Sequence, residues 1–122
     1  AKTCAMLKAY GGPFCVESFH PLAVHWFRKN EPAIIRGQLA YGLGQGRKVN
    51  AVNVLVGTLM QNVAGRPDFI AYEAVSDRNA AMGLMRLLRP TLVCWTVHTQ
   101  QDMDRLRARY DLQIFDGFVP KR

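Results

Sequence analysis

The sequence lacks a long apolar run. A membrane-spanning helix needs about 18 or more consecutive apolar residues. The longest apolar-rich stretch of this 122-residue chain, Val49–Val63, is interrupted by asparagine, glycine, threonine and glutamine. The first ten residues contain no uninterrupted apolar core with a cleavage-type ending, so we expect no secretory signal peptide. The pattern indicates neither an integral membrane segment nor an export signal.

Cysteine is also scarce. The three cysteines, Cys4, Cys15 and Cys94, lie far apart and form no Cys-x-x-C pair for zinc or redox chemistry. An odd set of unpaired cysteines favours a reducing compartment, and we expect a cytoplasmic protein. Cys15 and Cys94 lie in apolar, strand-like runs, where free cysteine behaves as a small buried hydrophobe. We therefore predict that both are buried.

Acidic residues are few, with 9 Asp+Glu against 16 Lys+Arg and a formal net charge of +7. The cations are spread along the chain, and several lie near the ends of predicted helices, where they favour the negative end of the helix dipole. No recognisable nucleic-acid motif gathers them on one face with aromatic residues. We expect no specific nucleic-acid partner. A basic module that binds phosphate or nucleic acid is the alternative function that remains open.

Five short runs rich in β-branched and aromatic residues predict strands. They are Phe14–Phe19, Ile34–Leu39, Phe69–Glu73, Leu92–Val97 and Gln113–Phe115. The segments between them have helical spacing and boundary signals. The predicted helices are Thr3–Tyr10 before Gly11-Gly12, a helix from Pro21 that Pro32 stops, Val49–Val63, Arg78–Leu88 with Asp77 as N-cap, and Gln100–Tyr110 with Thr99 as N-cap.

Alternating helices and strands predict an α/β fold with a parallel sheet and right-handed crossovers. We treat residues 1–122 as one domain. Two architectures use this pattern. One is a five-stranded, doubly wound, flavodoxin-like domain. The other is part of a (β/α)₈ TIM barrel, which typically needs about 250 residues.

Several segments in order resemble the bacterial glycerophosphodiester phosphodiesterase family. The segments are Gly12–Pro21 (GPFCVESFHP), Trp26–Asn30 (WFRKN), Ile35–Leu39 (IRGQL), Arg66–Tyr72 (RPDFIAY), Val93–Val97 (VCWTV) and Ile114–Phe118 (IFDGF). Each segment alone is weakly specific, whereas the ordered set covers nearly the whole chain. The resemblance implies a (β/α)₈ barrel that hydrolyses glycerophosphodiesters to glycerol 3-phosphate and an alcohol with a divalent cation, magnesium or calcium.

The family's His-Arg-Gly strand, metal-binding carboxylates, second catalytic histidine and Glu-x-Lys strand belong to the first half of the barrel. This sequence contains no His-Arg-Gly and no Glu-x-Lys, and its only acidic residues in predicted strands are Glu17 and Glu73. The resemblance therefore implies a C-terminal part of the barrel, about strands 4 to 8. Such a part holds no cation and no complete catalytic set by itself, so we expect it to be inactive alone. Its expected partners are the substrate and the N-terminal half of the barrel, and its open edge strands predict association as a homodimer or a domain swap.

Barrel active sites form at the carboxyl ends of the strands, which selects the candidate substrate-pocket residues. They are Ser18, Phe19, Gln38, Arg36, Tyr72, Glu73, Trp95 and His98. Trp95 is expected either to form an apolar wall beside the glycerol or alcohol moiety or to pack in the barrel core. Arg36 is expected either to face a phosphate or to pair with Glu17 on the neighbouring strand.

Three further features have open interpretations. His20 also follows a predicted strand, and His98 occupies a position where the family has asparagine. His25 lies mid-helix and is expected either at the surface or in packing. Gly42–Gly46 lies between a strand and a helix, where glycine-rich loops bind phosphate. It lacks the spacing of known phosphate-binding loops, so a loop over the barrel mouth is the alternative.

Overall fold

The structure is a computed structural model that describes residues 2–42, 62–76 and 78–121. Five strands form one all-parallel sheet in the order β1-β2-β3-β4-β5. They are β1 (Val16–Ser18), β2 (Arg36–Ala40), β3 (Phe69–Glu73), β4 (Thr91–Val97) and β5 (Leu112–Phe115). The predicted α/β class and parallel sheet are confirmed, and the strand order follows the chain order without a reversal.

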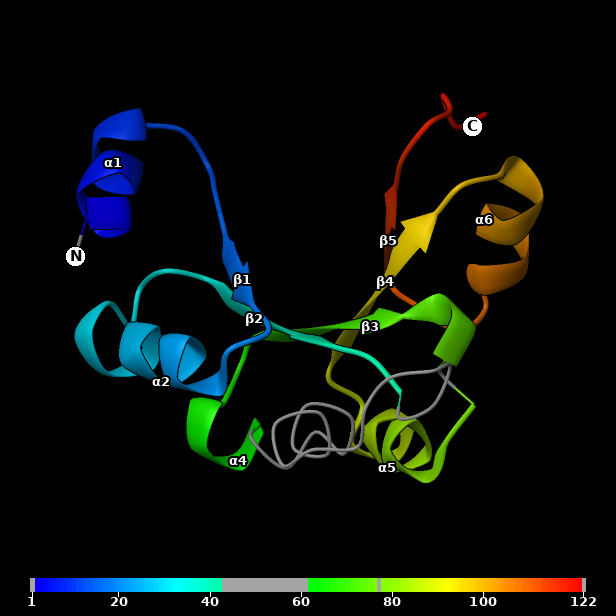
Figure 1. Ribbon diagram of the computed structural model, residues 1–122, viewed down its shortest axis with the longest axis horizontal. Helices are drawn as coiled ribbons and strands as arrows, with labels where there is room; N and C mark the ends of the chain where they lie inside the picture. The colour runs from blue at the N-terminus through cyan, green and yellow to red at the C-terminus, as the bar shows by residue number, and fades with distance from the viewer. Residues whose placement is uncertain (1, 43–61, 77, 122) are drawn as a thin grey trace.

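The helices among the described residues are α1 (Lys2–Tyr10), α2 (Pro21–Asn30), α4 (Asn62–Gly65), α5 (Ala80–Leu88) and α6 (Gln100–Leu106), with a 3₁₀ turn, η1, at Ala74–Ser76. In Figure 1 the sheet is curved, and α2, α4, α5 and α6 lie around its outer side. No helix of the described residues lies between β1 and β5 at the two edges (Figure 1). None of the described helices is long and apolar enough to cross a membrane.

Residue parity in the strands assigns the two faces of the sheet. Ile70, Tyr72, Leu92 and Cys94 share one core with Met82 of α5 and with Met103 and Leu106 of α6. We call this the helix-covered face. The residues between them point the other way, and this second face, which we call the concave face, carries Ile35, Phe69, Val93, Leu112 and Ile114 around a groove of about 760 Å³.

The concave face is apolar yet open to solvent. Ile35 is 54% exposed and Leu112 is 61% exposed, although both are large aliphatic side chains. Glu17 lies in the same groove, and its partial desolvation raises the pKa of its carboxyl. A parallel sheet is normally covered on both faces, so this exposure is the main anomaly of the fold.

Two aspartates form the same pair of hydrogen bonds at the amino ends of β3 and β5. Asp68 precedes β3, and its carboxylate accepts the backbone N–H of Arg36 at 2.9 Å while its own N–H donates to the Arg36 carbonyl at 2.8 Å. Asp111 precedes β5 and forms the same pair with Leu92, at 2.8 Å and 2.9 Å. Each aspartate thereby fixes the start of its strand beside the preceding one.

Most helix and strand boundaries agree with the sequence predictions to within a few residues. Pro21 occupies the first turn of α2, and the Thr99 hydroxyl accepts the N–H of Asp102 as predicted for an N-cap. Gly11 ends α1 at φ +69°, as expected for a glycine that stops a helix. The edge strand β1 is shorter than predicted, since pairing begins only at Val16 opposite Arg36.

Two local predictions are wrong. Helix α5 starts at Ala80 rather than Arg78, and its N-cap is Asn79, whose Oδ1 accepts the N–H of Met82 at 2.9 Å. Helix α6 ends at Leu106 rather than at Tyr110. The predicted cap Asp77, the predicted helix Val49–Val63 before Asn62, and the Gly42–Gly46 loop beyond Gly42 lie outside the described residues.

The cysteines divide between core and surface. Cys94 is fully buried on the helix-covered face, as predicted, and Cys4 is also buried. The prediction for Cys15 is wrong, because it precedes β1 at the sheet edge and is exposed in the concave groove. No neighbouring strand in the described residues covers that edge.

Candidate functional site

Three aromatic side chains meet near the carboxyl ends of the strands. Phe19 directly follows β1, Tyr41 directly follows β2, and Trp95 lies near the end of β4. The ring centroid of Phe19 is 5.6 Å from that of Tyr41 and 5.6 Å from that of Trp95, the second pair edge to face. Such pairs are favourable beyond the area that they bury. We call these three residues the aromatic wall.

Trp95 is held in place by its polar end. The indole Nε1–H donates to the backbone carbonyl of Ala71 on β3 at 3.0 Å, so the ring is fixed across the neighbouring strand. Glu73 is the register partner of Trp95, which places the two residues at the same level of the sheet. Phe19 remains 40% exposed, so the aromatic wall presents accessible apolar surface.

Glu73 belongs to a short hydrogen-bond chain. Its Oε2 accepts the Ser76 hydroxyl at 2.7 Å, and the Ser76 oxygen accepts the N–H of Gly42 at 2.8 Å. The chain joins the residues that follow β2 to the turn that follows β3. A side chain at Gly42 would collide with the Ser76 carbonyl, so glycine permits this close approach.

Two predicted pocket residues are buried on the helix-covered face. Gln38 is 1% exposed, and its Nε2 donates to the carbonyls of Ser18 and Phe19 at 2.9 and 3.2 Å. Tyr72 is fully buried, and its hydroxyl accepts the side-chain N–H of Asn79 at 2.8 Å. These bonds make Gln38 a tether for the end of β1 and Tyr72 a link to the cap of α5.

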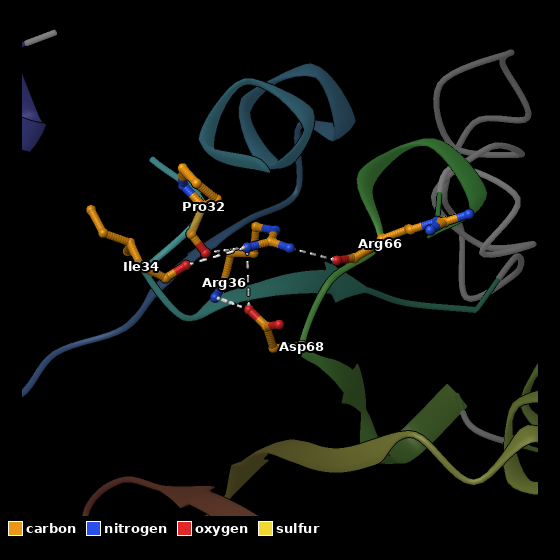
Figure 2. Close-up of polar contacts among 5 residues, drawn as sticks. All are labelled: Pro32, Ile34, Arg36, Arg66 and Asp68. Atoms are coloured by element: carbon orange, nitrogen blue, oxygen red, sulfur yellow. Dashed lines mark hydrogen bonds and ion pairs between the residues drawn. The ribbon is translucent and has the colours of Figure 1, made fainter. Parts of the chain in front are cut away.

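Arg36 lies at the opposite end of the sheet from the aromatic wall. Its guanidinium donates to the carbonyls of Pro32 and Ile34 at 3.4 Å each and to that of Arg66 at 3.1 Å, and its Nη1 lies 3.5 Å from Asp68 (Figure 2). The predicted ion pair with Glu17 is wrong. Arg36 is in register with Val16, so Glu17 points to the other face.

Ser18 and the histidines are peripheral. The Ser18 hydroxyl accepts the N–H of His20 at 3.0 Å, and His20 and His25 are exposed. His98 is exposed in a cleft of about 650 Å³ that lies between η1 and α6 on the outer side. The structure therefore brings Phe19, Glu73 and Trp95 to one end of the concave side and leaves His98 apart from them.

Tyr41 is a member of the aromatic wall that the sequence interpretation missed. Its signal was present, because an aromatic residue lies two positions after the predicted strand 34–39. Ser76 was missed as well, since nothing in the sequence indicates that it bonds both Gly42 and Glu73.

The described residues do not fit a divalent cation. No three histidine, cysteine, aspartate or glutamate side chains gather closely enough to hold a metal among the residues with described positions. Magnesium and calcium take six or more oxygen ligands, of which the carboxylate of Glu73 could supply at most two. Any such site needs ligands from elsewhere.

Comparisons with models of known protein families, with curated proteins and with solved structures return no match to this chain.

Proposed function

We propose that this chain is the C-terminal part of a (β/α)₈ barrel and forms part of the substrate pocket of a glycerophosphodiester phosphodiesterase. The exposed apolar side chains of the concave face carry the proposal. A doubly wound sheet reverses its strand order and has helices on both faces. A barrel keeps sequential order with its helices outside, which agrees with the order β1-β2-β3-β4-β5. The ordered motifs of the sequence support the specific family.

In this proposal the concave face is the inside of the barrel. Residues such as Ile35, Leu112 and Ile114 are exposed here and would be covered by side chains from the missing strands. β1 and β5 are the sheet edges, and each would pair with a strand of the N-terminal half. The raised pKa of the Glu17 carboxyl marks a group that full closure would desolvate further.

The aromatic wall would lie at the barrel mouth, where active sites of this fold form. Phe19, Tyr41 and Trp95 would pack against the carbon atoms of the glycerol or alcohol group and exclude water from one side of the ester. Glu73, held by Ser76, would accept a hydrogen bond from a substrate hydroxyl. The N-terminal half would hold the magnesium or calcium ion and the acid–base groups. The described residues are assigned no role in binding that ion.

The experiment is hydrolysis of glycerophosphocholine with magnesium or calcium. The chain alone is expected to give no turnover. Coexpression with the N-terminal half of a glycerophosphodiester phosphodiesterase barrel is expected to restore hydrolysis. Turnover by the isolated chain at about 1 per second, an ordinary enzymatic rate, would contradict the assignment as a barrel part.

Two tryptophan variants make the role of the aromatic wall specific. Trp95→Ala in the recombined barrel is expected to lower kcat/KM about tenfold, because the loss of an apolar contact with substrate costs on the order of 1–3 kcal/mol. Trp26→Ala is the matched control, since Trp26 is 38% exposed on α2 and packs on Phe27. Equal losses for the two variants would contradict substrate contact by Trp95.

A further inference from the structure

Four arginines line one open cleft at the amino ends of β4 and β5. The cleft has a volume of about 790 Å³. Its charged and aromatic lining consists of Arg86, Arg89, Arg107, Arg109, Tyr110 and Asp111. We call it the arginine cleft. It lies at the end of the sheet opposite the aromatic wall, and none of the candidate pocket residues lines it.

The local folding that creates the cleft comes from two helix ends. Helix α5 ends with Arg89 in the left-handed conformation at φ +52°, where its N–H donates to the Met85 carbonyl. Helix α6 ends at Leu106, and the carbonyl of that residue accepts N–H groups of both Arg109 and Tyr110. The paired hydrogen bonds of Asp111 with Leu92 bring these two chain segments together.

The electrostatics of the cleft are strongly one-sided. The lining holds four arginines and one acidic residue, Asp111, so its formal net charge is +3. A carboxylate oxygen of Asp111 already accepts the Leu92 N–H. The side chains of Arg89 and Arg107 form no hydrogen bond or ion pair with any described residue. Repulsion among like charges in one cleft is relieved when an anion binds between them.

A favourable helix dipole does not explain the whole cluster. A cation in the last turn of a helix gains up to about 1 kcal/mol from the dipole, which accounts for Arg86 on α5. It does not require that cations from two helices and the following turns converge on the same cleft. The convergence is a property of the tertiary structure and not of either helix.

We propose that the arginine cleft binds a ligand through a diphosphate group. The planar fork of an arginine guanidinium matches phosphate oxygens in bidentate pairs, and four arginines can serve two phosphate groups. The described lining comes from α5, the start of β4 and the turn between α6 and β5, so the proposal invokes no residue of another chain. It is independent of the proposed phosphodiesterase function and of the barrel mouth.

The test is calorimetric titration of the chain with inorganic pyrophosphate at constant ionic strength, with sulfate as the comparison anion. Wild-type chain is expected to bind pyrophosphate more tightly than sulfate, and the NMR signals of the Nε–H groups of Arg86, Arg89, Arg107 and Arg109 are expected to shift. The double variant Arg89→Gln/Arg107→Gln is expected to bind pyrophosphate about tenfold or more weakly, because two charge-assisted donors are lost. Both positions are exposed, so the variant is expected to keep its circular dichroism spectrum.

The matched control is Lys29→Gln/Arg66→Gln. It removes the same two positive charges from exposed positions beside α2 and α4 and is expected to bind pyrophosphate like the wild type. Equal weakening in both double variants, or sulfate binding as tight as pyrophosphate binding, would overturn the proposal. If Arg89→Gln/Arg107→Gln loses the folded circular dichroism spectrum, Arg89→Lys/Arg107→Lys takes its place, because it keeps both charges and removes both guanidinium groups. Unchanged affinity for pyrophosphate in that variant would overturn the proposed bidentate contacts.

Two further binding measurements, with lipid vesicles and with DNA, distinguish the possible sources of the phosphate groups. Cosedimentation with phosphatidylcholine vesicles that contain diacylglycerol pyrophosphate, lost in Arg89→Gln/Arg107→Gln, would support the same cleft with a lipid-borne diphosphate as its ligand. A random DNA duplex that binds more tightly than pyrophosphate and loses affinity equally in both double variants would overturn the proposal. That pattern identifies a diffuse polycation, whose affinity depends on salt and net charge.

Discussion

Replacement of Arg36 by methionine tests how the amino end of the sheet is held. Methionine keeps an unbranched apolar stem and removes the guanidinium. Three carbonyl acceptors then lose the guanidinium as donor, and Asp68 loses its ion pair but still accepts the backbone N–H of residue 36. The carbonyls belong to three separate positions, at Pro32, Ile34 and Arg66, so the side chain joins two loops to β2 (Figure 2).

The magnitude follows from the geometry of these contacts. The bond to the Arg66 carbonyl, at 3.1 Å, is expected to contribute about 1.5–3 kcal/mol as a hydrogen bond from a charged donor. The two bonds at 3.4 Å are beyond the preferred range and contribute little. The Arg36 Nε is buried without a partner among the described residues, and its removal returns on the order of 1 kcal/mol. The net destabilisation by Arg36→Met is therefore about 1 kcal/mol.

Urea unfolding measures this loss at constant protein concentration. With a slope of about 1–3 kcal/mol per molar, the midpoint is expected to fall by roughly 0.5 M. The matched variant Asp68→Asn keeps an oxygen for the Arg36 N–H and removes the charge. The Asp68 side chain is 46% exposed, so the coupling between the two substitutions is expected to be about 1 kcal/mol or less. A midpoint unchanged by Arg36→Met would refute the reasoning.

Three other predictions concern single positions. Asn79→Ala is expected to cost about 1–2 kcal/mol in urea unfolding, because α5 loses its N-cap and the Tyr72 hydroxyl loses its donor; Asn79→Asp, which keeps the cap, is expected to cost less. Gly37→Ala places a methyl group into the ring of Phe69 and is expected to destabilise the chain by about 1–3 kcal/mol, with Phe69→Leu in the same chain restoring part of the loss. Glu17→Gln is expected to stabilise the fold at neutral pH, because the raised pKa of Glu17 means that folding disfavours its charged form. The gain in stability is expected to vanish as the pH falls below the ordinary value of 4.5, because the carboxyl is then protonated in both the folded and the unfolded state. A gain that grows toward acid pH would contradict this sign.

The sequence predicts the strands and helices well because their signals are local. Pro21, Gly11 and Thr99 act through the backbone of their own turns, and the structure places each as expected. The N-cap of α5 shows the limit. Asp77 and Asn79 are both good capping residues, but the amide of Asn79 also donates to the Tyr72 hydroxyl, which a carboxylate cannot do. The tertiary contact favours a start that sequence alone does not select.

The site residues depend on register, which the sequence does not contain. A shift of one residue moves a side chain to the other face of a sheet. An ion pair between Arg36 and Glu17 is an expectation from the sequence, because their strands are neighbours. The register joins Glu17 to Gly37, so the two charges point to opposite faces. The same parity turns Gln38 and Tyr72 toward the helices and Trp95 toward the concave side.

The arginine cleft was beyond sequence interpretation for a different reason. Arg89 and Arg107 are each recognisable as basic residues near helix ends. Their proximity depends on the bonds between Asp111 and Leu92, which align the starts of β4 and β5. Only the assembled sheet brings these arginines together.

Sedimentation equilibrium of the chain at low micromolar concentration tests the central claim most directly. The claim is that other strands of a barrel pair with the edge strands β1 and β5 and cover the concave face. We predict a species heavier than the 13.7 kDa monomer when the chain is alone, and a one-to-one complex when the N-terminal half of the barrel is present. A monodisperse 13.7 kDa monomer that unfolds cooperatively and does not bind the N-terminal half would contradict the claim. That result would favour a complete doubly wound domain.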